Sequence, residues 1–193
     1  MKGLVAELRA AIAATLLLAV LCCGVYPAVV WGIGQALFPG KANGSMVRAD
    51  GKVAGSSLIA QGFAGPGYFH PRPSAAGQGY DATRSGGTNL GPISKKLIGD
   101  VKQRVSDYRT ENGLPPDAMV PADAVTSSAS GLDPHISARN AALQADRVAA
   151  TRGMTREVVL KKVRAHTEGR TFGIFGDPRV NVLMLNLDLD GKM

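Results

Sequence analysis

The sequence predicts one transmembrane helix near the N-terminus followed by a domain of mixed α/β (α+β) class. No charged residue occurs between Arg9 and Lys41, and the apolar run 10–33 exceeds the roughly 20 residues that cross a hydrocarbon core of about 30 Å. The roughly 150 residues that follow are enough for one domain with a sizeable core. Helix-capping patterns alternate there with short strand-like runs. We therefore divide the chain into a head (1–9), a span (10–33), a linker (34–43) and a domain (44–193).

A cleaved secretory signal and a buried helix of a soluble protein are the alternatives to a permanent span. A secretory signal has an apolar core of about 7 to 15 residues before its cleavage site. Here the apolar character continues past Cys22 and Cys23 to Trp31. Tyr26 and Trp31 also suit the aromatic belt at the far end of a span. The sequence therefore favours an uncleaved span, within which Pro27 loosens the far end.

Net charge and cysteine use limit the class of partner. The net charge is +7 and the pI is near 9.7, but aromatic residues make up only 5% and no nucleic-acid motif occurs. The basic residues are dispersed, which favours a solvated surface beside anionic lipids or an acidic partner. We expect no nucleic-acid partner. Both cysteines lie in the span, so the domain has no disulfide framework. Cysteine use therefore does not indicate the compartment in which the domain lies.

The span carries small residues at helical spacing. Ala6, Ala10 and Ala14 recur every fourth position, a pattern that lets a second membrane helix approach closely. The alternative is that alanine is simply common in this segment. The span lacks charged groups, which usually mark ion paths in membranes. If the protein takes part in ion transport, the path therefore belongs to a partner.

The first part of the domain predicts a hairpin and a long loop. Asp50-Gly51 suits a tight turn between strands at 46–48 and 53–54, and 57–60 fits either a strand or a short helix. Residues 62–92 are dense in Gly and Pro yet contain interleaved aromatic residues. A flexible linker is poorer in aromatics, so we expect an ordered recognition loop.

The second part of the domain predicts helices and then strands. Three helices are expected: Ser94 to about Asn112, Ser137 to about Gly153, and Thr155 to about Gly169. Each begins with a Ser or Thr cap and ends near a glycine. Between the first two lie a short apolar piece and an irregular polar segment. The last part predicts two strands, 171–175 and 180–189, because leucines alternate with polar residues at 183, 185, 187 and 189.

Motifs for catalysis, phosphate or metal are weak. There is no phosphate loop and no G-x-S-x-G elbow. His70, His135 and His166 lie far apart without metal-ligand spacing, so we predict no metal site. Ser130, Asp133 and His135 allow a hydrolase triad, but Asp133-Pro134 before Ser137 more simply predicts a turn leading into a helix cap.

One glycine-rich motif of the domain could bind an anion through its backbone. Its residues are Ser85, Gly86, Gly87, Thr88 and Asn89, and successive amides in such turns can form an anion nest. The alternative, which the sequence favours, is a turn packed against the core or a partner.

Several motifs occur in a family-specific order: SLIAQGF, YFHPRPSA, SGGTNLGP, VTSSASGLDPHIS, QADRVAATRG and AHTEGRTFGIFGDPRVNVLMLNLDLD. With the N-terminal span, they cover nearly the full length. On these motifs the chain resembles the KdpC family, the small subunit of the bacterial Kdp potassium-importing P-type ATPase. The phosphorylated D-K-T-G motif of the ATPase family is absent here.

The resemblance implies a single-pass subunit of the cytoplasmic (inner) membrane, with the N-terminus inside and the domain on the extracytoplasmic (periplasmic) side. It implies a non-catalytic role in assembly with a channel-like potassium-binding subunit and an ATP-hydrolysing catalytic subunit. The alternative function is a membrane-anchored hydrolase using Ser130, Asp133 and His135. We expect the partner interface at the small-residue stripe and the two irregular motifs: Ala6, Ala10, Ala14, Ser85, Gly86, Gly87, Thr88, Asn89, Asp133, Pro134 and His135.

The resemblance also implies a link to ATP. The family subunit is described as a catalytic chaperone that raises ATP affinity, and the glutamine matching Gln144 has been tied to nucleotide binding. If the domain lies outside, Gln144 cannot touch cytosolic ATP across about 30 Å of hydrocarbon. We therefore expect no bound cofactor in this chain, and an effect on ATP only through the complex.

Overall fold

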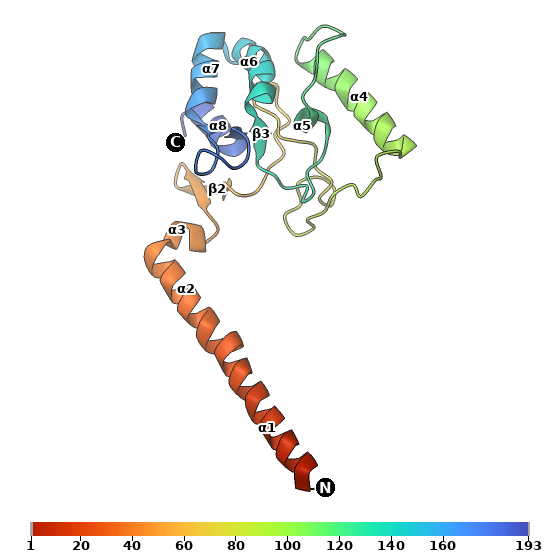
Figure 1. Ribbon diagram of the computed structural model, residues 1–193. Helices are drawn as coiled ribbons and strands as arrows, with labels where there is room; N and C mark the ends of the chain where they lie inside the picture. The colour runs from red at the N-terminus through yellow and green to blue at the C-terminus, as the bar shows by residue number, and fades with distance from the viewer. Residues whose placement is uncertain (1, 193) are drawn as a thin grey trace. The chain divides into compact units, whose positions relative to one another are not determined.

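The apolar N-terminal segment is one continuous helical run in the computed structural model, which describes residues 2–192 (Figure 1). It comprises α1 (Lys2–Ala19), a π-helical segment η1 (Val20–Val25) and α2 (Tyr26–Leu37). Its most apolar window has a mean hydropathy of 2.2, and none of that window is buried within the structure. By length and composition this helix can cross a membrane, as the sequence predicts.

The π-helical segment lies immediately before Pro27. A proline has no N–H, and its ring collides with the carbonyl four residues earlier in an α-helix. The π-helical turn before Pro27 is wider than an α-helical turn, and in it the N–H of Tyr26 donates to the carbonyl of Leu21. Pro27 therefore changes the span by widening one turn. Cys22 and Cys23 lie in this turn, and both are free thiols exposed from the helix.

The segment predicted as a linker, 34–43, is mostly helical. The long helix continues to Leu37, and a short helix α3 (Pro39–Ala42) follows at once. Pro39 suits the first turn of α3 because that position needs no N–H donor. The side chain of Asn43 then bonds to Gln35 and to the Pro39 carbonyl. The chain divides into two units, Met1–Met46 and Val47–Met193.

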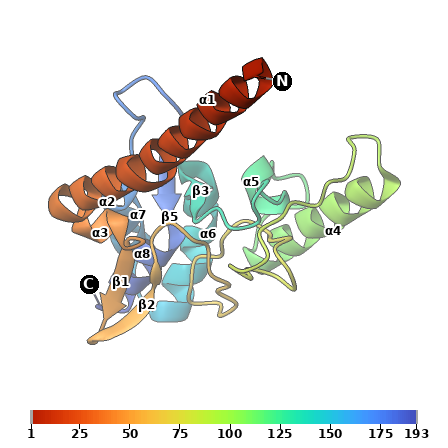
Figure 2. The same cartoon turned by 90° about the horizontal axis from the view of Figure 1, so that it is seen from below.

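The predicted hairpin is confirmed. Strands β1 (Met46–Ala49) and β2 (Lys52–Ser56) form a two-stranded sheet (Figure 2). Asp50 and Gly51 have φ values of 50° and 75°, the left-handed pair that a tight hairpin turn requires. Residues 57–60 form a turn rather than the expected strand or helix, and Ala60 bonds across to Leu132.

The three capped helices are confirmed: α4 (Lys95–Glu111), α6 (Ala138–Arg152) and α7 (Arg156–Ala165). Ser94, Ser137 and Thr155 each accept a hydrogen bond from the amide three residues on, as N-caps do. The third of these, α7, ends at Ala165, four residues before the expected stop at Gly169. The short apolar piece between α4 and α6 is one helical turn, α5 (Ala122–Val125).

The final strand prediction is wrong. Residues 180–189 form a short strand, β5 (Arg179–Asn181), followed by a helix, α8 (Val182–Leu189). Asn181 caps this helix by accepting from the amide of Met184. The helix is buried on nearly every side, so apolar residues occur all around it and the helical period disappears. An alternation of leucines therefore fits a buried helix as well as a strand.

The other predicted strand, 171–175, is a tight turn with one isolated bridge between Thr171 and Phe175. The pairing occurs just outside it, where β4 (Thr167–Glu168) and β3 (His135–Ser137) flank β5 antiparallel on its two sides. The register places Ile136 opposite Val180. The result is a three-stranded sheet in which β5 pairs with β4, its neighbour along the chain, and with the more distant β3.

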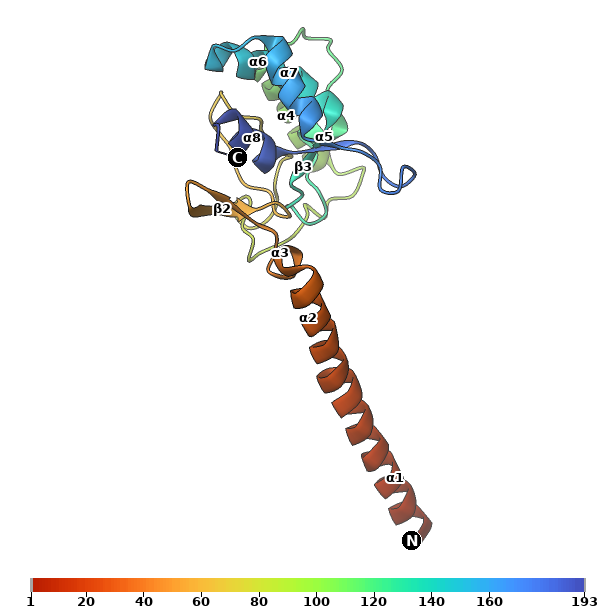
Figure 3. The same ribbon diagram turned by 90° about the vertical axis from the view of Figure 1, so that its left-hand side faces the viewer.

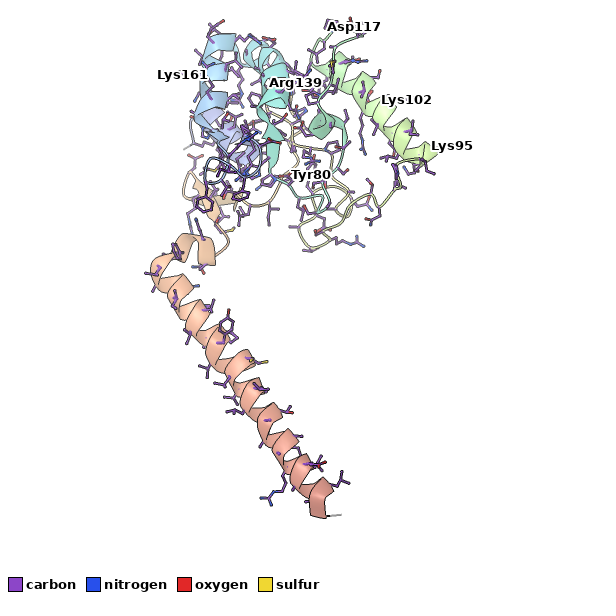
Figure 4. All side chains as sticks on the ribbon, viewed as in Figure 1. Tyr80, Lys95, Lys102, Asp117, Arg139 and Lys161 are labelled. Atoms are coloured by element: carbon purple, nitrogen blue, oxygen red, sulfur yellow. The ribbon has the colours of Figure 1, made fainter. Side chains whose placement is uncertain are left out.

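The core of the domain lies between this sheet and helices α6, α7 and α8. Its buried members are Phe69, Ile136, Ala141, Ala145, Val148, Ala149, Val159, Val163, Val180, Val182, Leu185 and Leu189. Phe69 comes from the long loop 62–92 and is fully buried. That loop is therefore packed, as predicted. The basic side chains are spread over the surface, with Lys95 and Lys102 extending from α4 and Lys161 from α7 (Figure 4).

Candidate functional site

The long loop is clamped between two helices at Phe69 and His70. The Asn186 amide of α8 accepts from the Phe69 N–H and donates to its carbonyl, both at 2.9 Å. The Gln144 amide of α6 does the same for His70, at 2.7 and 3.1 Å. In an extended segment successive residues point their backbone groups to opposite sides. Two side-chain amides therefore stand where two neighbouring strands would pair.

Two arginines of α6 hold the same loop from one side. Arg147 donates to the carbonyls of Pro66 and Tyr68, and also to Gln144 and Asn112. Burial is the main cause that lowers the pKa of Arg147 from its ordinary value. The guanidinium nevertheless stays charged, because its donors are shared among several oxygen acceptors.

Arg152 holds the start of the loop and the end of the last helix together. Its guanidinium lies 4.8 Å from the centre of the Tyr68 ring and donates to the Gly67 carbonyl. It also donates to Asp190 at 2.8 Å, and Asp190 accepts a second bond from the Tyr68 hydroxyl. The QADRVAATRG and YFHPRPSA motifs thus meet in space.

The glycine-rich motif packs against the segment that carries Ser130. The Gly86 amide and the Ser85 hydroxyl both donate to the Ser130 carbonyl, at 2.9 and 3.1 Å. At Gly131 a Cβ would lie 2.6 Å from the Gly86 carbonyl oxygen and 2.7 Å from the Ala76 nitrogen. Gly87 similarly approaches the Ala129 backbone. The Gly86 amide is therefore committed to a loop junction, which favours the packed-turn interpretation over an anion nest.

Thr88 and Asn89 are exposed, as is Ser85, whereas the two glycines between them are half-buried. Asn89 has a φ of 52°, a left-handed conformation that Asn tolerates better than most residues. The motif therefore packs its half-buried glycines against the neighbouring loop and leaves Ser85, Thr88 and Asn89 exposed.

A chain of paired acidic and basic side chains crosses the domain near Asp133 and His135. Arg72 Nη1 lies 3.1 Å from one Asp133 oxygen, and His135 Nδ1 lies 3.3 Å from the other. His135 Nε2 is 3.9 Å from Glu168, which pairs with Arg179 at 2.9 Å. The chain ties the long loop to all three strands of the sheet.

Asp133 is held ionised in this arrangement. Burial alone favours a higher pKa, but hydrogen bonds from His135 and Arg72 outweigh it and lower the pKa of Asp133 below its ordinary value. Pro134 is buried beside it, and its carbonyl accepts from the amide of Val182 at 3.0 Å. Asp133 and Pro134 therefore have structural partners on the loop, the sheet and the last helix.

The three triad candidates are only partly brought together. Asp133 and His135 pair, but the Ser130 hydroxyl accepts from the amide of Leu132 at 3.1 Å and lies 3.3 Å from the Ser128 hydroxyl. His135 has its second nitrogen facing Glu168. The Oγ of Ser130 thus serves a local turn, and the geometry described for these residues is a turn and an ion-pair chain.

Gln144 lies at the floor of a cleft of about 390 Å³ between α4 and the long loop. The amide makes four hydrogen bonds within the domain: it accepts from the His70 N–H and from Arg147, and it donates to the His70 carbonyl and to Asn140. On the opposite wall Glu111 pairs with His70 Nδ1 at 2.8 Å. The polar atoms of Gln144 are thus already used by the fold.

Tyr108 shares that floor. Its hydroxyl donates to the side chain of Asn140 at 2.8 Å. Burial, with Asp123 nearby, raises the pKa of Tyr108 well above its ordinary value, so the hydroxyl stays protonated as a donor. Among residues 2–192 the structure gathers no three His, Cys, Asp or Glu side chains able to hold a metal ion.

The small-residue stripe lies on the span. Ala6, Ala10 and Ala14 are exposed along α1. The described site residues therefore fall on two units: the stripe on the span, and the two packed loops with the charge chain on the domain. Sequence reasoning missed Asn186, Arg147 and Arg152, because each acts on a backbone segment more than 75 positions away. All three lie inside the motifs that carry the family resemblance, and this was the signal that could have drawn attention to them.

The chain matches known proteins along almost its whole length. The family model described as KdpC, K+-transporting ATPase, c chain, matches residues 8–191. A Nitratidesulfovibrio vulgaris protein is 56% identical over 185 residues, covering 94% of this chain and 92% of its own. A Koribacter versatilis protein is 51% identical over 191 residues, covering 98% and 95%. A Myxococcus xanthus protein is 57% identical over 171 residues, covering 87% and 80%.

All three relatives are named as the KdpC subunit of a potassium-transporting ATPase. Matches of this identity and coverage agree with the order of motifs described above and with the one candidate membrane helix found among residues 2–192. The chain therefore belongs to the KdpC family and is a subunit of a K+-transporting ATPase.

Proposed function

We propose that this chain is a non-catalytic subunit that stabilises assembly of the K+-transporting ATPase, joining a channel-like potassium-binding subunit to the ATP-hydrolysing subunit. The observation that carries the proposal is the clamp on Phe69 and His70. Buried amides and arginines fix the long loop on the domain surface, and a rigid loop loses little entropy when a partner binds it.

The proposed interface has two parts. The stripe of Ala6, Ala10 and Ala14 receives a membrane helix of a partner, since small residues permit close backbone approach. The packed loops present Thr88 and Asn89 to a partner's outer surface. Two independent contacts on one chain raise the effective concentration of the second after the first has formed.

The domain is proposed to lie on the extracytoplasmic side of the inner membrane, with the N-terminus inside. The basic head supports this orientation, because Lys2 and Arg9 flank the span on its N-terminal side. Protease added to each side of sealed vesicles tests it: the domain is expected to be cut only from the outer side. Cleavage from the cytoplasmic side would overturn the orientation.

An effect on ATP affinity is proposed to arise by coupling through the partner subunits. The amide of Gln144 is engaged in four internal hydrogen bonds, so ATP would have to displace the clamp to reach it. Coupling of this kind is reciprocal: whatever tightens ATP binding also tightens assembly. Calorimetry with the full chain alone is expected to give no ATP binding, whereas saturable binding would contradict the coupling.

Deletion of the chain tests the assembly role directly. The remaining subunits are expressed together and purified through the ATP-hydrolysing subunit, with and without this chain supplied on a second plasmid. Without it, we expect the potassium-binding subunit to be lost and potassium-stimulated ATPase activity to fall, and the plasmid copy should restore both. An intact, potassium-stimulated ATPase lacking this chain would refute the proposal.

A further inference from the structure

The turn between β4 and β5 exposes three large apolar side chains at one place. Phe172, Ile174 and Phe175 are 89%, 71% and 65% exposed. The loop that carries them projects from the rest of the domain in Figure 3. At roughly 200 Å² for a large side chain they offer on the order of 400 Å² of apolar surface, a size at which the largest apolar patch of a protein is often functional.

This turn is a built hairpin. The amides of Thr171 and Phe175 each donate to the carbonyl of the other, at 2.9 and 3.0 Å, and the Gly173 amide donates to Arg170. Phe172 has a φ of 55°, a region that an aromatic residue rarely adopts. The hairpin therefore holds its apolar side chains outward, where the rest of the domain does not cover them.

The base of the hairpin is electrically balanced. Arg170 pairs with Asp177 at 3.3 Å, and Arg179 pairs with Glu168 at 2.9 Å. Each of these two arginines thus has a carboxylate beside it. A loop that inserts into anionic lipid usually carries surplus basic charge, whereas an apolar, aromatic centre within a polar rim is typical of protein interfaces.

We propose that Phe172, Ile174 and Phe175 form an anchor that inserts into an apolar pocket on another subunit of the ATPase. The inference rests on the assembly function proposed above and adds a third contact, separate from the alanine stripe and the two packed loops. The neutral rim fits an uncharged or mixed-charge edge around that pocket, and the partner supplies the cover that the domain itself does not.

The complex with a changed anchor gives the first test. The substitution Phe172→Ser is made in the full chain, and the ATPase complex is purified through this chain at rising detergent concentration. We expect the amount of partner retained to fall about tenfold or more, as for an interface hot spot. Phe172→Leu, which keeps an apolar side chain, should retain most of it. Equal retention by Phe172→Ser and the unchanged chain would overturn the proposal.

Ile93 provides the matched control, because it is 90% exposed but stands alone. Ile93→Ser should leave retention unchanged. Thermal unfolding of the full chain alone should be the same for Phe172→Ser and Ile93→Ser, since neither side chain is buried. If Ile93→Ser weakened the complex as much as Phe172→Ser, the loss would be a general effect of surface polarity and the anchor would be rejected.

Fluorescence separates a protein pocket from lipid. Trp31 is the only tryptophan, so the chain with Trp31→Phe and Phe172→Trp reports on the hairpin. In vesicles containing this chain alone we expect a solvent-exposed emission that brominated lipids do not quench, and a blue shift when the other subunits are present. Quenching by brominated lipid without the partners would identify the membrane as the occupant and overturn the proposal.

The two proposals fail in different ways. If deleting the whole chain leaves an intact complex, the assembly function fails. If deletion dismantles the complex but Phe172→Ser does not weaken it, only the hairpin anchor fails.

Discussion

Gln144 and His70 lie 74 positions apart in the chain, and the side-chain amide of Gln144 makes two hydrogen bonds with the backbone of His70. Gln144 is 1% exposed. The Gln144 side chain pairs with this loop segment in the way that a neighbouring strand would. A glutamine is needed there because a side-chain amide offers a donor and an acceptor at the spacing of a peptide group.

Gln144→Leu should therefore destabilise the domain strongly. The change keeps the volume but leaves the part-buried His70 N–H and carbonyl without these partners, at about 1–3 kcal/mol each, for a loss of about 2–6 kcal/mol. Urea unfolding of the full chain in detergent, followed by circular dichroism, measures the loss. Gln103→Leu on the exposed side of α4 is the control and should change stability by about 0.5 kcal/mol or less. Similar losses for the two variants would contradict a clamp.

The junction of the two irregular loops depends on Gly131. Gly131→Ala should cost more than the backbone strain alone, because its Cβ would meet the Gly86 oxygen and the Ala76 nitrogen at 2.6 and 2.7 Å. Gly113 has nearly the same left-handed φ, 62° against 67°, but open space around it.

Gly113→Ala thus isolates the strain, about 1 kcal/mol, and Gly131→Ala should exceed it by about 1–3 kcal/mol from overpacking. Thermal unfolding of the two full-length variants, measured side by side, gives the difference. If both lose the same stability, the loops do not meet at Gly131 as described.

Local signals predicted much of the fold, and tertiary ones did not. Ser94, Ser137 and Thr155 cap their helices as expected, because a cap is decided within four residues. The strand predicted at 180–189 failed because burial on all sides erased the helical period. The clamp by Asn186 could not be predicted, because its partner lies 117 positions away and nothing near Asn186 distinguishes it from a polar strand residue.

The candidate site follows the same division. The sequence allowed a triad of Ser130, Asp133 and His135 but favoured a turn, and it did not predict which of these side chains meet. Asp133 and His135 pair in the structure, whereas the Ser130 hydroxyl bonds within its own turn. The hairpin that carries Phe172 was predicted as a strand because its apolar residues suggested a buried segment. In the structure these side chains are exposed.

Acid should weaken the domain through Asp188. Lys162 Nζ lies 2.6 Å from one of its oxygens and His166 Nε2 lies 3.1 Å from the other. The hydrogen bond from Lys162 is the main cause that lowers the pKa of Asp188, and that from His166 adds to it. A lowered folded-state pKa stabilises the fold above the ordinary value of about 3.9, and this contribution is lost as the pH falls through the lower folded value.

Asp188→Asn should accordingly reduce stability at pH 7 and flatten the fall in stability below about pH 4. Denaturant unfolding of the full chain between neutral and acid pH measures both. The exposed Asp117, which Figure 4 shows in the loop after α4, supplies the control: Asp117→Asn should leave the curve nearly unchanged. A curve for Asp188→Asn that runs parallel to that of the unchanged chain would exclude Asp188 as the source of the acid sensitivity.

The alanine stripe predicts which face of the span meets a partner helix. Ala10→Leu should hold that helix away, since the isopropyl group that it adds at a close helix–helix contact costs about 1–3 kcal/mol. Ala19 lies nine residues on and, at about 100° per residue, faces the opposite side of the helix.

Ala19→Leu is therefore the matched control, with the same change in volume and in hydropathy. Co-purification of the partner subunits at rising detergent concentration should show a loss of about tenfold for Ala10→Leu and none for Ala19→Leu. Both variants should insert equally well, because leucine favours a membrane environment more than alanine does. Equal losses would mean that the span is packed on both faces, and a loss for Ala19→Leu alone would place the docking face on the other side of the helix.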